Sequence, residues 1–266
     1  MMRFLAVSLV AVCLSLPAFA DLKIQDVKAT YGPNGPARDS LTTFAGDTMF
    51  FSYTVTGIKA DDNGGIKVRI RNQLKNSDGK VLLSEQQPAQ GFLALGGSEM
   101  AGYASVTFGL DYPPGEYTVA VTVTDEVANQ TMSFERKVEL QKPDFAMINV
   151  RFFLDADSKV AAAGTLARTE RLYIRFSAIG FDRSANKLDL TMFIQTLDEK
   201  GTELIPKPIR AEVKSDQPEQ VAKITAANFS GNLVLNRAGA YRIHIMVEDA
   251  VNKKKLDVVV PIKVVD

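Results

Sequence analysis

The sequence predicts an all-β protein made of two consecutive antiparallel β-sandwich domains. Three observations predict this: apolar residues alternate with polar ones, turn-forming residues separate these runs, and the second half of the chain repeats the first. A period of two places one side of a strand against a core and the other in water. With 266 residues, of which 46% are hydrophobic and 23% charged, the chain is long enough to form two such cores.

The first 20 residues predict a signal peptide. Arg3 precedes an apolar run over residues 4–16, and Ala18-Phe19-Ala20 forms the small-x-small pattern that signal peptidase cleaves. The apolar run is shorter than the ~20 residues that a membrane anchor needs. We therefore expect export to the periplasm, the cell surface or the medium, and a mature chain that begins at Asp21 and has no integral membrane segment.

Lipidation at Cys13 is the alternative interpretation of this leader. Val12 disfavours it, because a lipoprotein signal has Gly, Ala or Ser before its cysteine. Since Cys13 is the single cysteine of the chain, cleavage leaves no thiol. Disulfides, thiol catalysis and thiolate metal sites are then excluded, and each domain depends on its own core.

The strands follow in the same order in both halves. Residues 49–55, 66–70 and 117–123 show an apolar residue at every second position, and the turn-forming runs at 61–65, 76–79 and 113–115 separate them. The matching segments of the second half are 172–178, 188–192 and 241–247, with turns at 198–201 and 237–239. About seven short strands per domain are expected, with one short helical turn within 218–229.

The internal repeat sets the domain boundaries. Residues 115–125 align without gaps on 239–249, residues 49–57 on 172–180, and even the first strands correspond, with Ile24 and Val27 opposite Met147 and Val150. We predict domains at 22–141 and 144–266, joined at Gln141-Lys142-Pro143. Because Pro143 favours an extended link, the domains are expected to sit end to end in near contact, as a rod.

Two matching tyrosines give the sandwiches a recognisable pattern. Gly115-x-Tyr117-x-Val119 and Gly239-x-Tyr241-x-Ile243 resemble the tyrosine-corner strand of immunoglobulin-like domains, in which the tyrosine hydroxyl bonds back to the preceding corner. Val119 and Ile243 stand where a cysteine is common, and the chain has no Trp. The resemblance is to cysteine-free immunoglobulin-like or fibronectin-III-like modules of bacterial exported proteins. It implies a fold and a non-enzymatic role in adhesion, spacing or ligand presentation.

The supply of catalytic and metal-binding residues is short. His244 is the single histidine, and its neighbours Ile243 and Ile245 point inward, so a solvated outer-face histidine is expected. No catalytic, cofactor-binding or metal-binding residue is predicted. Calcium binding at Asp155 with Asp157, or at Asp61 with Asp62, stays open beside the interpretation that these residues initiate turns.

Two further groups of charged residues are interpreted structurally. Asp125 and Asp249 end matching strands and are expected to form turns. Lys67, Arg69 and Arg71 form a basic stripe on the outer face of one strand, where it would discourage edge-to-edge aggregation.

Net charge limits the partners. The chain has 31 basic and 31 acidic residues, which disfavours nucleic acid. The sequence therefore predicts an exported non-enzymatic interaction or structural module, with an unknown protein or a surface polymer as its partner. A carbohydrate-binding sandwich is the alternative, disfavoured by the absence of Trp, and a hydrolase of unrecognised type is a weaker one.

Overall fold

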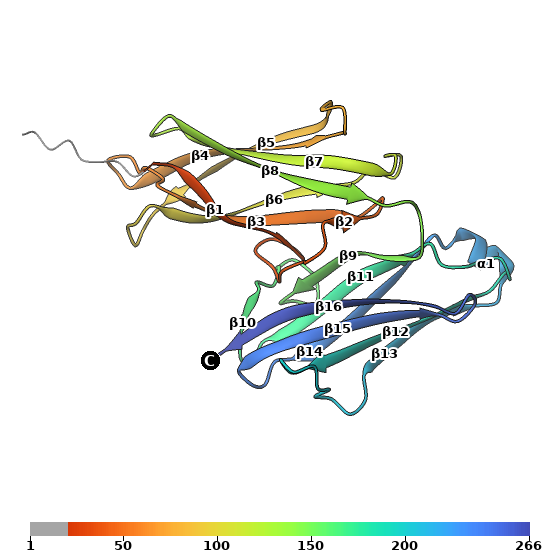
Figure 1. Ribbon diagram of the computed structural model, residues 1–266. Helices are drawn as coiled ribbons and strands as arrows, with labels where there is room; N and C mark the ends of the chain where they lie inside the picture. Colours follow the sequence, from red (N-terminus) through yellow and green to blue (C-terminus); the bar gives the residue numbers. More distant parts are fainter. Residues whose placement is uncertain (1–20) are drawn as a thin grey trace, which may run out of the picture.

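The computed structural model describes residues 21–266, so the predicted signal peptide and Cys13 lie outside the described residues. The described chain forms two β-sandwiches, each with one three-stranded and one five-stranded sheet (Figure 1). This confirms the predicted fold class of tandem immunoglobulin-like sandwiches. Among residues 21–266, no helix has the length and apolar character needed to cross a membrane.

The first sandwich stacks the sheet β1-β3-β6 on the sheet β2-β8-β7-β4-β5. All neighbouring strands are antiparallel except β2 and β8, which are parallel. Its strands are β1 (Lys23–Thr30), β2 (Thr42–Thr43), β3 (Thr48–Thr56), β4 (Gly65–Lys75), β5 (Val81–Phe92), β6 (Glu99–Thr107), β7 (Gly115–Asp125) and β8 (Gln130–Leu140).

The second sandwich has the same topology, with β9-β11-β14 stacked on β10-β16-β15-β12-β13. A six-residue helix, α1 (Pro218–Lys223), occupies the place of the expected helical turn. The strands are β9 (Ala146–Phe153), β10 (Thr165–Ala167), β11 (Arg171–Ile179), β12 (Leu188–Leu197), β13 (Ile209–Ser215), β14 (Ala226–Val234), β15 (Gly239–Asp249) and β16 (Lys254–Val265).

Each core lies where the two-residue period predicts it. On β3 the alternating side chains of Met49, Phe51, Tyr53 and Val55 are buried, and β11, β12, β15 and β16 of the second domain bury alternate side chains in the same way. Each sandwich has an eighth strand beyond the seven expected, because β2 and β10 are too short to show a period.

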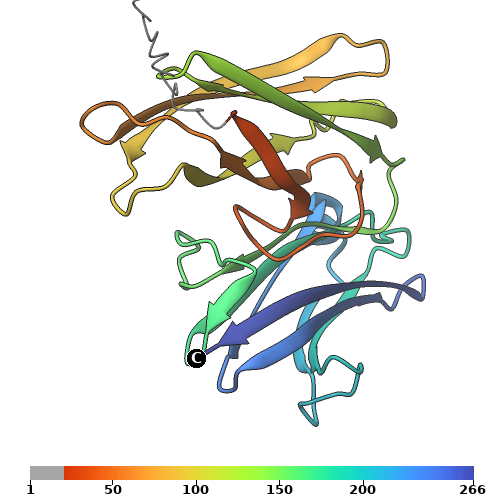
Figure 2. The same cartoon turned by 60° about the vertical axis from the view of Figure 1, so that its left-hand side comes forward.

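The relation of the domains differs from the expected rod. In Figure 1, β8 runs to the right and β9 runs back to the left beneath the first domain, and the turned view of Figure 2 shows the same reversal. Where the chain reverses, the linker packs closely on the second domain. A Cβ on Gly180, which has a φ of 66°, would lie 2.1 Å from the carbonyl oxygen of Asp144. Near contact was therefore predicted correctly, whereas the end-to-end direction was wrong.

The basic stripe also has a different role from the one expected. Its strand, β4, lies between β5 and β7, so Lys67, Arg69 and Arg71 cover a sheet face and protect no edge. The edge strand is β5, and Pro88 lies at its middle opposite Arg69. Proline has no N–H group to offer to another strand, and it is tolerated in sheets mainly at such edges.

Candidate functional site at the domain junction

A β-bulge in β9 gives the second domain its contact with the first. The pairing of β9 with β11 shifts register between Arg175 and Ser177, at the level of Asn149. Asn149 has a φ of 53°, a left-handed conformation that asparagine tolerates better than most residues. Because a bulged residue is not paired within its own sheet, the backbone N–H and the side chain of Asn149 are free to reach the first domain.

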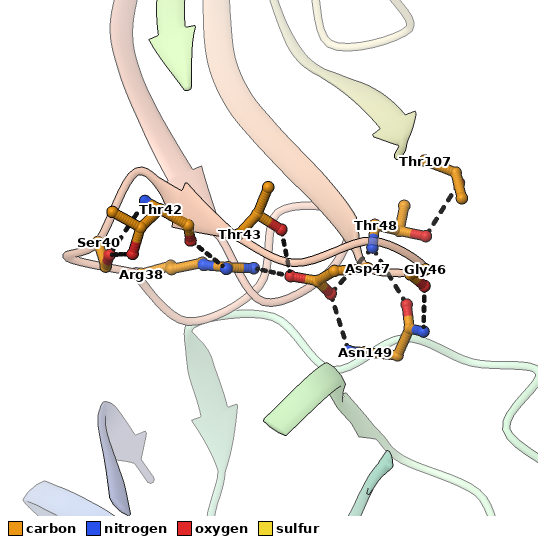
Figure 3. A network of polar contacts seen from close by, with 9 residues as sticks. All are labelled: Arg38, Ser40, Thr42, Thr43, Gly46, Asp47, Thr48, Thr107 and Asn149. Atoms are coloured by element: carbon orange, nitrogen blue, oxygen red, sulfur yellow. Dashed lines mark hydrogen bonds and ion pairs between the residues drawn. The ribbon is translucent and has the colours of Figure 1, made fainter. Parts of the chain in front are cut away.

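Three hydrogen bonds join Asn149 to the first domain (Figure 3). Its backbone N–H donates to Oδ1 of Asp47 at 2.8 Å, and its Nδ2 donates to the carbonyl oxygen of Gly46 at 2.9 Å. Its Oδ1 accepts from the backbone N–H of Thr48 at 3.2 Å. The asparagine amide thus forms a two-way bridge to the backbone that leads into β3.

Asp47 is the centre of this junction network. Its side chain is 2% exposed, and its Oδ2 accepts from Nη1 of Arg38 at 3.0 Å and from Oγ1 of Thr43 at 2.8 Å. Oδ1 serves Asn149 and the backbone N–H of Thr48. One buried carboxylate therefore connects the loop after β1, strand β2, the start of β3 and the second domain (Figure 3). A buried carboxylate needs such partners, because its desolvation costs several kcal/mol.

Aromatic and backbone contacts extend the junction on both sides. The guanidinium of Arg151 lies 4.8 Å from the ring centroid of Phe50, and burial lowers the pKa of Arg151. Tyr31 meets Phe152 edge to face at 6.1 Å. The N–H of Gly164 donates to the carbonyl oxygen of Asn34 at 3.1 Å. Phe50 is on the outer face of β3, and its burial shows how far the second domain covers that face.

The arrangement is suited to holding two domains in one orientation. The polar network sits between apolar and aromatic contacts, and buried polar bonds of this kind are directional as well as stabilising. The donors and the carboxylate oxygens of the network are paired with one another rather than turned to an open site. Such contacts suit a mechanical role, in which the junction limits how the domains move relative to each other.

The two candidate calcium clusters close turns. Oδ1 of Asp61 accepts from the N–H groups of Asn63 and Gly65, and these bonds lower the pKa of Asp61. Asp155 accepts from Lys159 and Val160, with the same effect on its pKa, and Asp157 pairs with the Lys159 ammonium. Across residues 21–266, no group of three or more His, Cys, Asp or Glu side chains is placed to hold a metal ion.

Asp125 and Asp249 occupy equivalent buried positions and form turns in both domains. Oδ1 of Asp125 accepts from the backbone N–H groups of Val127 and Ala128, and its Oδ2 accepts from that of Lys59. Asp249 accepts in the same way from Val251 and Asp182. Each carboxylate ties the β-turn after its strand to a loop from the other sheet.

His244 lies on the outer face of the five-stranded sheet, between Gln195 and Val259. Its Nε2 is 3.5 Å from Oδ2 of Asp257, and its side chain is 24% exposed. The histidine is thus more covered than the solvated residue that the sequence predicts, because neighbouring side chains on the same face surround it.

Both tyrosine corners form, with different geometry. The Tyr117 hydroxyl donates to the carbonyl oxygen of Pro113 at 2.6 Å, and burial raises the pKa of Tyr117. The Tyr241 hydroxyl donates to Ala238, three residues upstream, at 3.1 Å. The longer bond belongs to the ring that is less buried.

Sequence reasoning missed Asp47 and Asn149. A signal for Asn149 is present: Met147 and Val150, like Ile24 and Val27, are three residues apart, and an odd spacing between core positions indicates a bulge. No comparable signal marks Asp47, because an aspartate beside a glycine is typical of any turn.

No known protein family and no curated protein matches this sequence. Among solved structures, the C-terminal domain of the AgI/II polypeptide BspA from Streptococcus agalactiae is 12% identical, with a TM-score of 0.31 over 91% of this chain and 100% of that one. Latent dimeric PorU from Porphyromonas gingivalis is 11% identical, with a TM-score of 0.38 over 97% of this chain and 21% of that one. Likenesses this distant carry no inference about function.

Proposed function

We propose that the protein is an exported, non-enzymatic interaction or structural module of the cell envelope or the extracellular space. The junction carries this proposal: Asp47 and Asn149 hold two sandwiches as one unit, which suits the presentation of a surface at a fixed orientation. Its partner is a protein or a surface polymer. The pattern of residues 1–20 supports export.

A distance measurement tests the mechanical part. The predicted mature chain lacks cysteine, so cysteines introduced at Lys80 and Lys200, in exposed turns of the two domains, carry spin labels at those sites alone. We expect one narrow distance distribution. Asn149→Ala should broaden it, whereas Asp26→Ala should leave it unchanged, because Asp26 occupies the equivalent bulge of β1 and is exposed. Equal distributions for the wild type and Asn149→Ala would contradict the proposal.

Export and interaction are tested in source cells. Mass spectrometry of the purified chain should find Asp21 at the N-terminus, whereas an intact Met1 or an acylated Cys13 would contradict this step. In vivo crosslinking should give a defined complex in the envelope or the medium. A crosslinked complex lost in Asn149→Ala and retained in Asp26→Ala would connect the interaction to the junction, and a chain found only as an uncrosslinked monomer would contradict the interaction role.

A further inference from the structure

The edge strand β14 lacks the features that usually protect the edge of a sheet. It pairs with β11 along its whole length without a register shift, and residues 226–234 include no charged side chain and no proline. The other edge strands of the second domain are protected: β10 has three residues, β9 has the bulge at Asn149, and β13 carries Arg210, Glu212 and Lys214 on its outer face. Short length, bulges and charged side chains are common means of keeping an edge from pairing with another chain.

The backbone of β14 presents hydrogen-bonding groups at this edge. The N–H of Leu235 donates to the carbonyl oxygen of Glu170 at 2.9 Å, in the register that continues along β14 and β11. Because antiparallel strands alternate between bonded and non-bonded pairs, the N–H and C=O groups of Ser230, Asn232 and Val234 point away from β11. Among residues 21–266, no other strand pairs with this side of β14. The edge is therefore a template for one more strand.

The opposite sheet offers an apolar surface to such a strand. That sheet has five strands against three, and its edge strand β13 lies across the sandwich from β14. Ile209, Ala211 and Val213 of β13 point inward but are only half-buried, whereas the inward side chains of the adjacent β12 are fully buried. A cleft of about 1030 Å³ lies between Ile209 and residues 232–235, and its lining has as many acidic as basic side chains. The cleft therefore favours apolar groups without a preference for charge.

The corresponding place in the first domain is unsuited to an added strand. There β6 takes the position of β14, and β5 takes that of β13. The inward positions of β5 include Glu85 and Gln87, which are exposed and lie opposite Asn72 and Ile70 of β4. A strand added to β6 would remove the Glu85 carboxylate from water without giving it a partner, which is strongly unfavourable. Of the two domains, only the second combines an unprotected edge with an apolar surface beside it.

We propose that β14 binds an extended segment of a partner polypeptide as a fourth strand of its sheet. The segment runs antiparallel to β14 and pairs with the backbone of Ser230, Asn232 and Val234. Apolar side chains at every second position of the segment pack against Ile209 and into the cleft, so the backbone supplies affinity and the alternate side chains supply specificity. A polypeptide has N–H and C=O groups at the spacing of a strand, which favours a protein partner over a surface polymer. The inference rests on the proposed role as an interaction module and names the class of its partner.

A peptide titration on residues 21–266 tests the added strand. The probe is acetylated and amidated Lys-Thr-Val-Thr-Val-Thr-Val-Lys, and the comparison peptide, Lys-Thr-Thr-Val-Val-Val-Thr-Lys, has the same composition without the alternation. When the probe occupies about 90% of the sites, amide hydrogen exchange of Ser230, Asn232 and Val234 should slow about tenfold, because only the free protein exchanges there. The comparison peptide should bind about tenfold more weakly, because it cannot turn all of its valines to the apolar side.

Methylated peptides and two proline variants test the backbone pairing. Probe residues that bond to β14 have their side chains on the outer face, as Asn232 does, so they are the threonines. N-methylation of the threonines should abolish binding, whereas N-methylation of the valines should preserve it. Ser230→Pro removes one outward N–H and should weaken binding about fivefold. Ala101→Pro, at an outward position of β6, should not alter binding.

Several results would overturn the proposal. These are equal binding of the alternating and comparison peptides, equal effects of the two methylation patterns, equal effects of the two proline variants, and slowed exchange in β6 instead of β14. The spin-label distances report the junction separately, so failure here is distinguishable from failure of the proposed function.

Discussion

The two domains have the same topology and differ at the same end. In the first, Tyr112 and Phe108 close the space beside Tyr117, and the bulge of the second domain packs against the neighbouring loops. In the second, the shorter connection at 235–238 leaves the space beside Tyr241 open. The difference teaches that the strands specify the repeated fold, while a few loop residues decide whether the space beside the corner tyrosine is filled or open.

The bulges repeat this lesson. Asp26 in β1 and Asn149 in β9 both have a φ of 53° and both interrupt strand pairing. Only Asn149 meets another domain. The carboxamide of Asn149 offers a hydrogen-bond donor and an acceptor at once, whereas an ionised aspartate offers acceptors only. The same bulge therefore contacts the other domain at Asn149 and stays exposed at Asp26.

The largest expected effect is at Asp47. Asp47→Ala removes a buried acceptor of four hydrogen bonds and takes from Arg38 its ion-pair partner, which should lower the free energy of unfolding by about 3–5 kcal/mol. Glu170→Ala, at the equivalent place in the second domain, loses a single bond to the N–H of Ala167 and should cost about 0.5–1.5 kcal/mol. Urea unfolding followed by circular dichroism checks both. Similar losses would contradict the assignment of Asp47 as the centre of the junction.

A second pair should show what the copies share. Asp125→Ala leaves three backbone N–H groups without their acceptor, and Asp249→Ala leaves two. At about 1 kcal/mol for each bond, we expect losses of about 3 and 2 kcal/mol. Amide hydrogen exchange assigns each loss to its own domain. A negligible effect at either position would show that its turn forms without the carboxylate.

The third prediction is that high pH lowers the stability of the first domain through Tyr53. Burial raises the pKa of Tyr53 to about 12, and within residues 21–266 its buried hydroxyl has no hydrogen-bond partner. Since the unfolded tyrosine ionises near 10, the folded state favours the neutral form. This contribution is complete below pH ~10 and is lost as the pH rises from ~10 towards ~12, a change of about 2–3 kcal/mol. The first domain should weaken over that range in urea unfolding, and Tyr53→Phe should flatten the dependence. An unchanged slope in that variant would contradict the assignment.

The smallest effects are expected at the tyrosine corners. Tyr117→Phe loses the 2.6 Å bond of the buried ring and should cost about 1–1.5 kcal/mol, and Tyr241→Phe should cost about 0.5 kcal/mol, because its longer bond belongs to a half-buried ring. Thermal melting of both variants checks the order. A larger loss of stability in Tyr241→Phe than in Tyr117→Phe would mean that the Tyr241 ring is packed more tightly than its half-buried position implies.

The sequence predicts the parts of this protein that depend on local pattern. The period of two in residues 49–55 and 117–123 determines which faces are buried, because successive side chains of a strand point to opposite sides. The glycine and tyrosine pattern at 115–117 and 239–241 predicts both corners. Strands β2 and β10 escape this reasoning, because two or three residues carry no period and their pairing with β8 and β16 depends on the completed sandwich.

Only the tertiary structure decided how the two domains contact each other and that the space beside Tyr241 stays open. The amino-acid sequence by itself determined the all-β fold, the internal repeat and the positions of the turns, because turn formation and alternation depend on residues that are close together in the sequence. Beside the reversal at Pro143, Asp144 closely approaches Gly180, and the junction is formed by Asp47 and Asn149, about a hundred residues apart along the chain. Such contacts leave no periodic signal, because each is a single meeting of surfaces that exist only after both sandwiches have folded.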